Sequence, residues 1–277
     1  LMTDPFGNYL IQKLLERCSD DQRSQIIDQV CASLVSISLN MHGTRAVQKL
    51  IETINSEEQV KKVTEALKPG VVTLVKDLNG NHVVQRCLQK LEHDASQFIY
   101  EIAAEHCVDI ATHRHGCCVL QRCIDYASSP QQARLATEIA ANALLLSQDP
   151  FGNYVVQYIL DLSNPTASVQ IMTQLHGHYP YLSTQKFSSN VVEICLKLGP
   201  ADEREHIIRE LAMAPTLGNL LQDPYANYVL QSALYVAKVG MQVCGLRNFA
   251  RYLMSMLRCR EICTVNLLKR FAPSYPC

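Results

Sequence analysis

One sequence pattern recurs seven times along the chain, and it limits the possible folds more than any other feature. In each copy a small residue, Gly, Ser or Ala, precedes a short segment of mixed polar and apolar residues. Examples are DPFGNYLIQK from Asp4, where the small residue is Gly, and DPYANYVLQS from Asp223, where it is Ala. The residues that directly follow the small residue are Asn8, Thr44, Asn81, Cys117, Asn153, Ser189 and Asn227. They are spaced by 36, 37, 36, 36, 36 and 38 residues. A fixed period of this length indicates a repeat protein.

Each repeat is expected to fold as two helices, as the second repeat illustrates. Asp20 or Asp21 can cap a first helix that continues to Val30. A short apolar stretch then leads to the motif, and a second helix is expected from Thr44 to about Ile54. No alternating strand pattern of useful length occurs. The sequence therefore predicts an all-α fold, a solenoid whose repeats bury their apolar faces against their neighbours.

The repeats divide the chain into two parts. Residues 1–237 are expected to form the repeat array, with an incomplete first repeat, so that a further helix or a whole repeat is expected upstream of Leu1. Residues 238–277 contain helical pieces but no copy of the motif. Because the ends of a solenoid must cover their exposed core, this segment is expected to be a C-terminal helical cap.

The composition narrows the possible functions. The chain has 25 Lys and Arg against 26 Asp and Glu, a net charge of −1, so a grip on nucleic acid through phosphates alone is not expected. Its 12 cysteines lie mostly in apolar helical runs, as Cys87, Cys123 and Cys195 do, and are expected to be buried, reduced thiols. No run reaches the 18 apolar residues of a membrane span. A cytoplasmic protein with no membrane contact is expected.

The second helix of each repeat carries two faces. In the first repeat the residues of the apolar face are Leu10, Ile11, Leu14, Leu15 and Cys18. The other face carries Asn8 and Gln12, one helical turn apart, with Tyr9 beside them. The same triplet of positions recurs as Thr44, Arg45, Gln48; Asn81, His82, Gln85; Cys117, Cys118, Gln121; Asn153, Tyr154, Gln157; Ser189, Asn190, Glu193; and Asn227, Tyr228, Gln231.

These triplets favour recognition of RNA bases. In a single repeat, the Asn could simply cap the helix and the Gln could simply be a solvated surface residue. That explanation does not account for six Gln and one Glu at the same turn of seven repeats. Amides can donate to and accept from the Watson–Crick edge of a base, and a planar or cationic residue beside them can stack on the ring, worth roughly 1–3 kcal/mol. A carboxylate only accepts hydrogen bonds, so Glu193 with Ser189 is expected to bind guanine, whose edge presents two donors.

The motifs GNYxxQ, GNHxxQ, SNVVE and ANYxxQ occur in an order that resembles the Pumilio/FBF (PUF) family of RNA-binding proteins over residues 4–237. That family has eight repeats, and the seven here resemble its second to eighth. The resemblance implies a right-handed, curved α-solenoid that binds one base per repeat. It also implies a monomer that binds 3′ untranslated regions of messenger RNA, and regulates translation or decay with deadenylase or repressor proteins.

The resemblance further implies a base for each triplet, with the RNA antiparallel to the protein. In the family's pattern Asn with Gln binds uracil, Cys or Ser with Gln binds adenine, and Ser with Glu binds guanine. The predicted RNA is therefore 5′-UGUAUAU-3′, from Asn227 and Gln231 at the 5′ end to Asn8 and Gln12 at the 3′ end.

Two triplets depart from the family's pattern. Thr44 replaces the usual Cys or Ser, but it is small enough to leave room for adenine. Cys118 occupies a stacking position that is usually aromatic or Arg, so weaker stacking is expected there. The string THRHGCCVLQR from Thr112 is similar to that of a fungal branch of the family, whose members can accommodate an extra base. An extra base in the 3′ half of the site therefore stays open.

Basic residues that follow the triplets are candidates for phosphate contact or ordinary solvated charges: Lys13, Lys49, Arg86 and Arg122. Tyr158, Ile194 and Ser232 interrupt this series. Cys117, Cys118 and Cys123 lack a second cysteine pair at zinc-site spacing, and no catalytic motif occurs, so no metal, cofactor or enzymatic activity is expected. The alternative is a protein-binding scaffold of the armadillo or HEAT type, although the period of those repeats is usually longer.

Overall fold

The computed structural model describes residues 1–162 and 164–240. These residues form α-helices and short 3₁₀ turns, and no β-strand occurs among them. The chain divides into two compact units, Leu1–Leu175 and a second unit that begins at His176. The cap expected at residues 238–277 lies outside the described residues, apart from the last three residues of the final helix.

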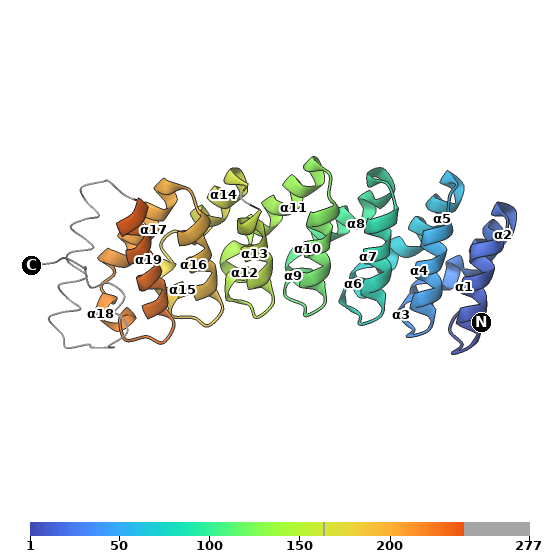
Figure 1. Cartoon of the computed structure of the whole chain (residues 1–277), viewed down its shortest axis with the longest axis horizontal. Helices are drawn as coiled ribbons and strands as arrows, with labels where there is room; N and C mark the ends of the chain where they lie inside the picture. Colours follow the sequence, from blue (N-terminus) through green and yellow to red (C-terminus); the bar gives the residue numbers. More distant parts are fainter. Residues whose placement is uncertain (163, 241–277) are drawn as a thin grey trace, which may run out of the picture. The chain divides into compact units, whose positions relative to one another are not determined.

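The first unit contains a row of motif helices, each of which begins at the glycine of its motif. They are α1 (Gly7–Arg17), α4 (Gly43–Thr53), α7 (Gly80–Lys90), α10 (Gly116–Tyr126) and α13 (Gly152–Asp161). Each motif helix packs against the next one in the series (Figure 1). Residues at the same position of successive motifs are therefore brought onto neighbouring helices.

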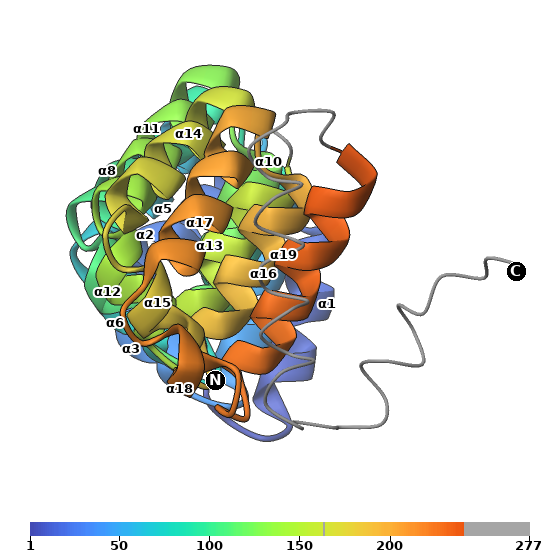
Figure 2. The ribbon, with the colours of Figure 1, turned by 90° about the vertical axis from the view of Figure 1, so that its left-hand side faces the viewer.

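A second row of helices flanks the motif helices of this unit. The flanking helices are α2 (Asp20–Val30), α5 (Glu57–Leu67), α8 (His93–Glu105), α11 (Ser129–Ala141) and α14 (Pro165–Leu175). Figure 2 shows them on one side of the unit, with α1, α10 and α13 on the other. Short helices connect the two rows: α3 (Leu34–Leu39), α6 (Val71–Lys76), α9 (Cys107–Ala111) and α12 (Ala143–Gln148).

The short helices refine the expectation of two helices per repeat. The apolar stretch before the second motif forms a helix of its own, α3, after a 3₁₀ turn at Cys31–Ser33. The expected cap of α2 was also wrong. Ser19 caps this helix, because its hydroxyl accepts from Gln22 N while the Gln22 side chain accepts from Ser19 N. Asp20 lies in the first turn, where its carboxylate binds Arg23.

The second unit repeats this arrangement of helices. Its described helices are α15 (Tyr179–Ser183), α16 (Ser188–Leu198), α17 (Ala201–Met213), α18 (Leu217–Leu220) and α19 (Ala226–Gly240). The motif helices α16 and α19 pack against each other, and α17 packs on both. The second unit therefore contains the same three kinds of helix as the first: motif helices, a flanking helix and short helices.

Close packing at the start of each motif helix explains the small residue of the motif. A Cβ atom on Gly43 would lie 2.3 Å from the carbonyl oxygen of Ile37, a distance that no side chain tolerates. Ser188 occupies the same place in α16 and donates from its hydroxyl to the equivalent carbonyl, that of Leu182, at 2.7 Å. The small residue thus lets the motif helix begin directly against the end of the short helix.

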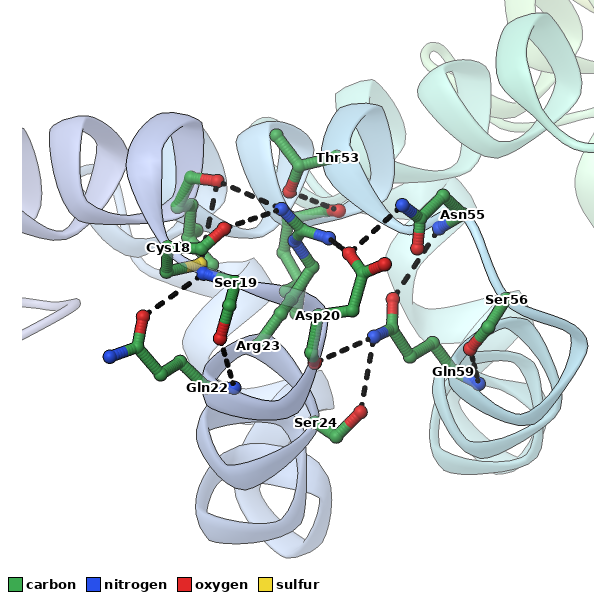
Figure 3. A network of polar contacts seen from close by, with 12 residues as sticks. Cys18, Ser19, Asp20, Gln22, Arg23, Ser24, Thr53, Asn55, Ser56 and Gln59 are labelled. Carbon is green, nitrogen blue, oxygen red and sulfur yellow. Dashed lines mark hydrogen bonds and ion pairs between the residues drawn. The ribbon is translucent and has the colours of Figure 1, made fainter.

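Polar side chains hold neighbouring flanking helices in register (Figure 3). The Asn55 amide donates to the Asp20 carboxylate at 2.9 Å, across α2 and the start of α5. Gln59 donates to the backbone carbonyl of Asp20 and to the hydroxyl of Ser24, both at 3.1 Å. Because these contacts join residues that are 35 or more apart in the sequence, they fix one repeat against the next.

The apolar stripe predicted on the first motif helix is only partly buried. Leu15 is fully buried, whereas Leu10 is 64% exposed and Leu14 is 45% exposed. The corresponding residues of α4, Ala46 and Leu50, are fully buried, because α4 packs between α1 and α7. The stripe therefore faces the core only where a motif helix lies on both sides.

The described cysteines are free thiols, and most are buried, as the sequence predicts. Burial raises the pKa of Cys87, Cys123 and Cys195 to about 12, so these thiols stay protonated at neutral pH. Three described cysteines are exceptions: Cys18 and Cys31 are half-buried, and Cys118 is exposed. Within the described residues no helix combines the length and the apolar content that a membrane crossing requires.

Candidate nucleic-acid interface

The three motif positions differ systematically in exposure. The first position is buried in six motifs, at Asn8, Thr44, Asn81, Cys117, Asn153 and Ser189, and half-buried at Asn227. The second position is exposed in all seven, at Tyr9, Arg45, His82, Cys118, Tyr154, Asn190 and Tyr228. The fifth position is half-buried in all seven, at Gln12, Gln48, Gln85, Gln121, Gln157, Glu193 and Gln231. Four of the exposed side chains are rings, at Tyr9, His82, Tyr154 and Tyr228, and a ring next to a recessed polar group suits a base that stacks and hydrogen-bonds at once.

In the Asn–Gln motifs the buried Asn orients the Gln. Asn8 Nδ2 donates to the backbone carbonyls of Asp4 and Pro5, both at 2.9 Å, so its Oδ1 points toward the fifth position. Gln12 Nε2 donates to that oxygen at 3.0 Å. Gln85 and Gln157 make the same bond to their own Asn at 2.9 and 2.8 Å, and Gln231 at 3.1 Å.

This bond sets what each Gln presents. Its amide keeps one N–H and the Oε1 oxygen for a ligand, a donor and an acceptor side by side. Uracil offers the complementary pair, its N3–H and a carbonyl oxygen. The sequence could show that the two amides are one turn apart, but not that Asn is tied to its own backbone and that Gln therefore makes the outward contact.

The two motifs assigned to adenine are held differently. Thr44 donates to the backbone carbonyl of Asn79 in the following repeat at 2.9 Å and accepts from Gln48 at 3.2 Å. Gln121 Nε2 donates instead to the backbone carbonyl of Tyr154, at 3.2 Å. Sequence reasoning missed Asn79, which also donates to the Leu39 carbonyl at 3.0 Å. A residue of the neighbouring repeat thus helps to position the first side chain.

The motif of α16 has a carboxylate at the fifth position. Glu193 is half-buried and accepts from Lys197 Nζ, one turn further along the helix, at 2.6 Å. Sequence reasoning did not identify Lys197, although its spacing of four residues from Glu193 places it on the same face. The carboxylate retains lone pairs on both oxygens with which it can accept further hydrogen bonds.

All four candidate phosphate residues are paired with carboxylates. In the first three motifs they form an ion-pair ladder of Lys13, Glu16, Lys49, Glu52 and Arg86. Its distances are 2.9 Å for Lys13–Glu16, 3.3 Å for Glu16–Lys49, 2.8 Å for Lys49–Glu52 and 3.2 Å for Glu52–Arg86. Hydrogen bonds from Lys13 and Lys49 lower the pKa of Glu16, and Glu52 is the main cause of the raised pKa of Lys49.

The pairing continues at the fourth motif with different chemistry. Arg122 lies 3.2 Å from Asp125, and the hydroxyl of Tyr158 donates to the same carboxylate from the next motif helix. This bond is also the main cause of the raised pKa of Tyr158. Tyr158, which interrupts the basic series in the sequence, therefore replaces the cation as a neutral donor. The acidic residues were missed, although each lies three residues after its cation.

A helical solenoid with an exposed side chain and a recessed amide or carboxylate at fixed positions of each repeat defines a repeat protein with a modular binding surface. The Pumilio-family RNA binding repeat matches the chain at residues 1–31, 33–66, 70–102, 106–140, 142–176, 178–212 and 219–238. The chain therefore belongs to the Pumilio family of RNA-binding repeat proteins. This membership favours RNA binding over an armadillo- or HEAT-type protein scaffold.

Relatives and solved structures agree with this assignment. The chain is 55% identical over 241 residues to Pumilio homolog 12 of Arabidopsis thaliana, covering 86% of this chain and 40% of that protein. It is 51% identical over 239 residues to a Pumilio domain-containing protein of Schizosaccharomyces pombe, covering 86% of this chain and 35% of that protein. The chain thus spans half or less of the length of these curated relatives.

A solved structure resembles the whole fold. It is the Puf4 RNA binding domain bound to the HO endonuclease RNA 3′ UTR recognition sequence, with a TM-score of 0.83 and 43% identity. The match covers 97% of this chain and 84% of that chain. In the described part of the chain, no group of three or more His, Cys, Asp or Glu side chains is placed to hold a metal ion.

Proposed function

We propose that the chain binds single-stranded RNA by sequence, one base per motif, with 5′-UGUAUAU-3′ as its core site. The single observation that carries the proposal is the repeated exposure pattern, with a buried first position, an exposed second position and a half-buried fifth position. The two motifs of the second unit are assigned the 5′ bases U and G. The five motifs of the first unit are assigned U, A, U, A and U.

The chemistry of the fifth position supports these assignments. A Gln held by Asn presents one donor and one acceptor, as uracil requires. Glu193 presents acceptors alone, which fits the two donors on the Watson–Crick edge of guanine. Where Thr44 or Cys117 replaces Asn, the first side chain is smaller and leaves room for adenine. The exposed second positions are assigned to stacking, which is sequence-tolerant and leaves specificity to the recessed polar groups.

The likeness to an RNA-bound Puf4 domain supports a role on messenger RNA. The proposal is that the chain binds 3′ untranslated regions in the cytoplasm as a monomer, and represses translation or promotes decay through deadenylase or repressor proteins. Crosslinking of the tagged protein in cells, followed by sequencing of the bound RNA, tests this role. Enrichment of the core site in 3′ untranslated regions is expected, and enrichment in coding or non-coding RNA alone would contradict it.

A binding assay tests the specificity directly. Fluorescence anisotropy with a labelled UGUAUAU RNA is compared with the same RNA in which G is changed to A. Loss of the two guanine donors leaves the Glu193 carboxylate without its partners, so the A-containing RNA should bind at least about tenfold more weakly. Equal binding of both RNAs, or of neither, would overturn the proposal.

An exchange of two residues tests the assignment of one base to one motif. The double variant Ser189→Asn with Glu193→Gln gives α16 the pair found in α1, α7, α13 and α19. Its preferred RNA should change from UGUAUAU to UUUAUAU, with the other bases unaffected. A variant that still prefers G at this base would show that another part of the protein selects it.

A further inference from the structure

The position four residues after the recessed polar group varies with the charge of that group. In the seven motifs these residues are Glu16, Glu52, Gln89, Asp125, Asp161, Lys197 and Tyr235. Four of them are acidic, and each of these follows a neutral Gln. The one basic residue follows the one acidic recognition residue, Glu193. The chain therefore reverses the charge at this position in the motif that is assigned to guanine.

The structure shows that this reversal produces a direct contact. Lys197 Nζ lies 2.6 Å from Glu193 Oε2, with the Glu193 side chain 24% exposed and that of Lys197 53% exposed. Both residues line a cavity of about 640 Å³ between α16 and α19, together with Tyr228 and Gln231 of the last motif. The ion pair therefore borders the space where a base between Glu193 and the ring of Tyr228 would lie.

A base in this cavity would remove water from the carboxylate. Desolvation of an ionised carboxylate is unfavourable unless its charge is paired and its lone pairs are hydrogen-bonded. Guanine supplies two neutral donors, which satisfy lone pairs but do not balance the charge. Lys197 supplies the balancing charge, and because it approaches Oε2 from one turn away along the helix, acceptor sites remain on both oxygens for the base.

We propose that Lys197 is a positioning residue for guanine recognition, which holds the Glu193 carboxylate in place and balances its charge when the base covers it. This inference rests on the proposed function, in which Glu193 contacts guanine. It predicts that Lys197 affects binding only through Glu193. A cation that contacted the RNA phosphates directly would instead strengthen the binding of every RNA sequence to the same extent.

The test combines Lys197→Met with a change of RNA. Met preserves the length of the side chain and removes its charge. The full chain carrying Lys197→Met should bind UGUAUAU about tenfold more weakly, and UAUAUAU less than about twofold more weakly, so that the preference for G falls. Lys197→Arg should retain most of the preference, because Arg can also donate to the carboxylate. An equal loss on both RNAs would overturn the inference and indicate phosphate contact.

A double-mutant cycle provides the second readout. In the Ser189→Asn, Glu193→Gln background the carboxylate is absent, so adding Lys197→Met should change binding of UUUAUAU by less than about twofold. A tenfold loss in this background would also overturn the inference. Arg209→Met is the matched control, because it removes an exposed ion pair of the same spacing, Arg209–Glu205 on α17, away from the motif residues.

Two further measurements separate the possible failures. Thermal unfolding of Lys197→Met should match that of the parent chain, because an exposed ion pair contributes little to stability. If the parent chain itself shows no preference for UGUAUAU over UAUAUAU, the proposed function fails and this inference fails with it. If the parent chain shows the preference and Lys197→Met keeps it in full, only the role of Lys197 is overturned.

Discussion

Replacing Glu52 with Gln should increase the salt dependence of RNA binding. Glu52 joins two cations of the ion-pair ladder, Lys49 at 2.8 Å and Arg86 at 3.2 Å, and its side chain is only 25% exposed. Lys49 and Arg86 are candidate phosphate contacts, so we expect this carboxylate to compete with RNA phosphates for both cations. Gln has nearly the same shape and no charge, so the variant should release Arg86 fully and Lys49 in part, because Lys49 also pairs with Glu16 at 3.3 Å.

The size of the effect follows from the number of cations released. Each phosphate neutralised on a single strand contributes about −0.7 to the slope of log K against log salt concentration, so two cations steepen the slope by up to about 1.4. Between 50 and 200 mM salt, the variant should then lose up to about sevenfold more affinity than the parent chain. Lost ion pairs should reduce the free energy of unfolding by about 1 kcal/mol or less.

Anisotropy titrations of UGUAUAU at four or five salt concentrations measure the slope. Glu58→Gln is the matched control, because it makes the same charge change on the flanking helix α5, where Glu58 pairs with Lys62 at 3.1 Å. This control should leave the slope unchanged. If Glu52→Gln also leaves the slope unchanged, or weakens binding at low salt, the ladder serves to hold α4 against α7 and does not compete with phosphates.

Two other predictions concern a thiol and a turn. Iodoacetamide at pH 8 should modify the exposed Cys118 but not Cys123, because burial raises the pKa of Cys123 to about 12. If a base covers Cys118, saturating UGUAUAU should slow its modification, which mass spectrometry can follow. Equal modification rates with and without RNA would contradict the place of Cys118 in the binding surface. In the second unit the Glu210 carboxylate accepts hydrogen bonds from the backbone N–H groups of Gly177 and Tyr179, both at 2.9 Å. Glu210→Ala should therefore lower the free energy of unfolding, measured by urea titration, by about 1–3 kcal/mol. A change below about 0.3 kcal/mol would show that other groups replace these bonds.

The sequence alone determined the architecture and the set of candidate residues. The repeat of about 36 residues requires similar units stacked in a row, because each unit buries its apolar face only against a neighbour. Helical spacing also places the first and fifth motif positions one turn apart, with the second position beside them, and the second and fifth positions have the same exposure class in every motif. The types of side chain at these positions then indicate the chemistry of the ligand. These features are local, so the order of residues is enough to specify them.

The tertiary structure decided how those residues are held. Spacing on one helix cannot show that Thr44 bonds to the backbone of Asn79, or that Glu16 pairs with Lys49, because both contacts join different repeats and depend on how adjacent helices pack. The exposure of Leu10 was likewise not evident, since an apolar stripe is buried only where a neighbouring helix covers it. The sequence specifies the type of each side chain and the period of the repeat. The orientation of the side chains and their contacts between repeats depend on how the helices pack together.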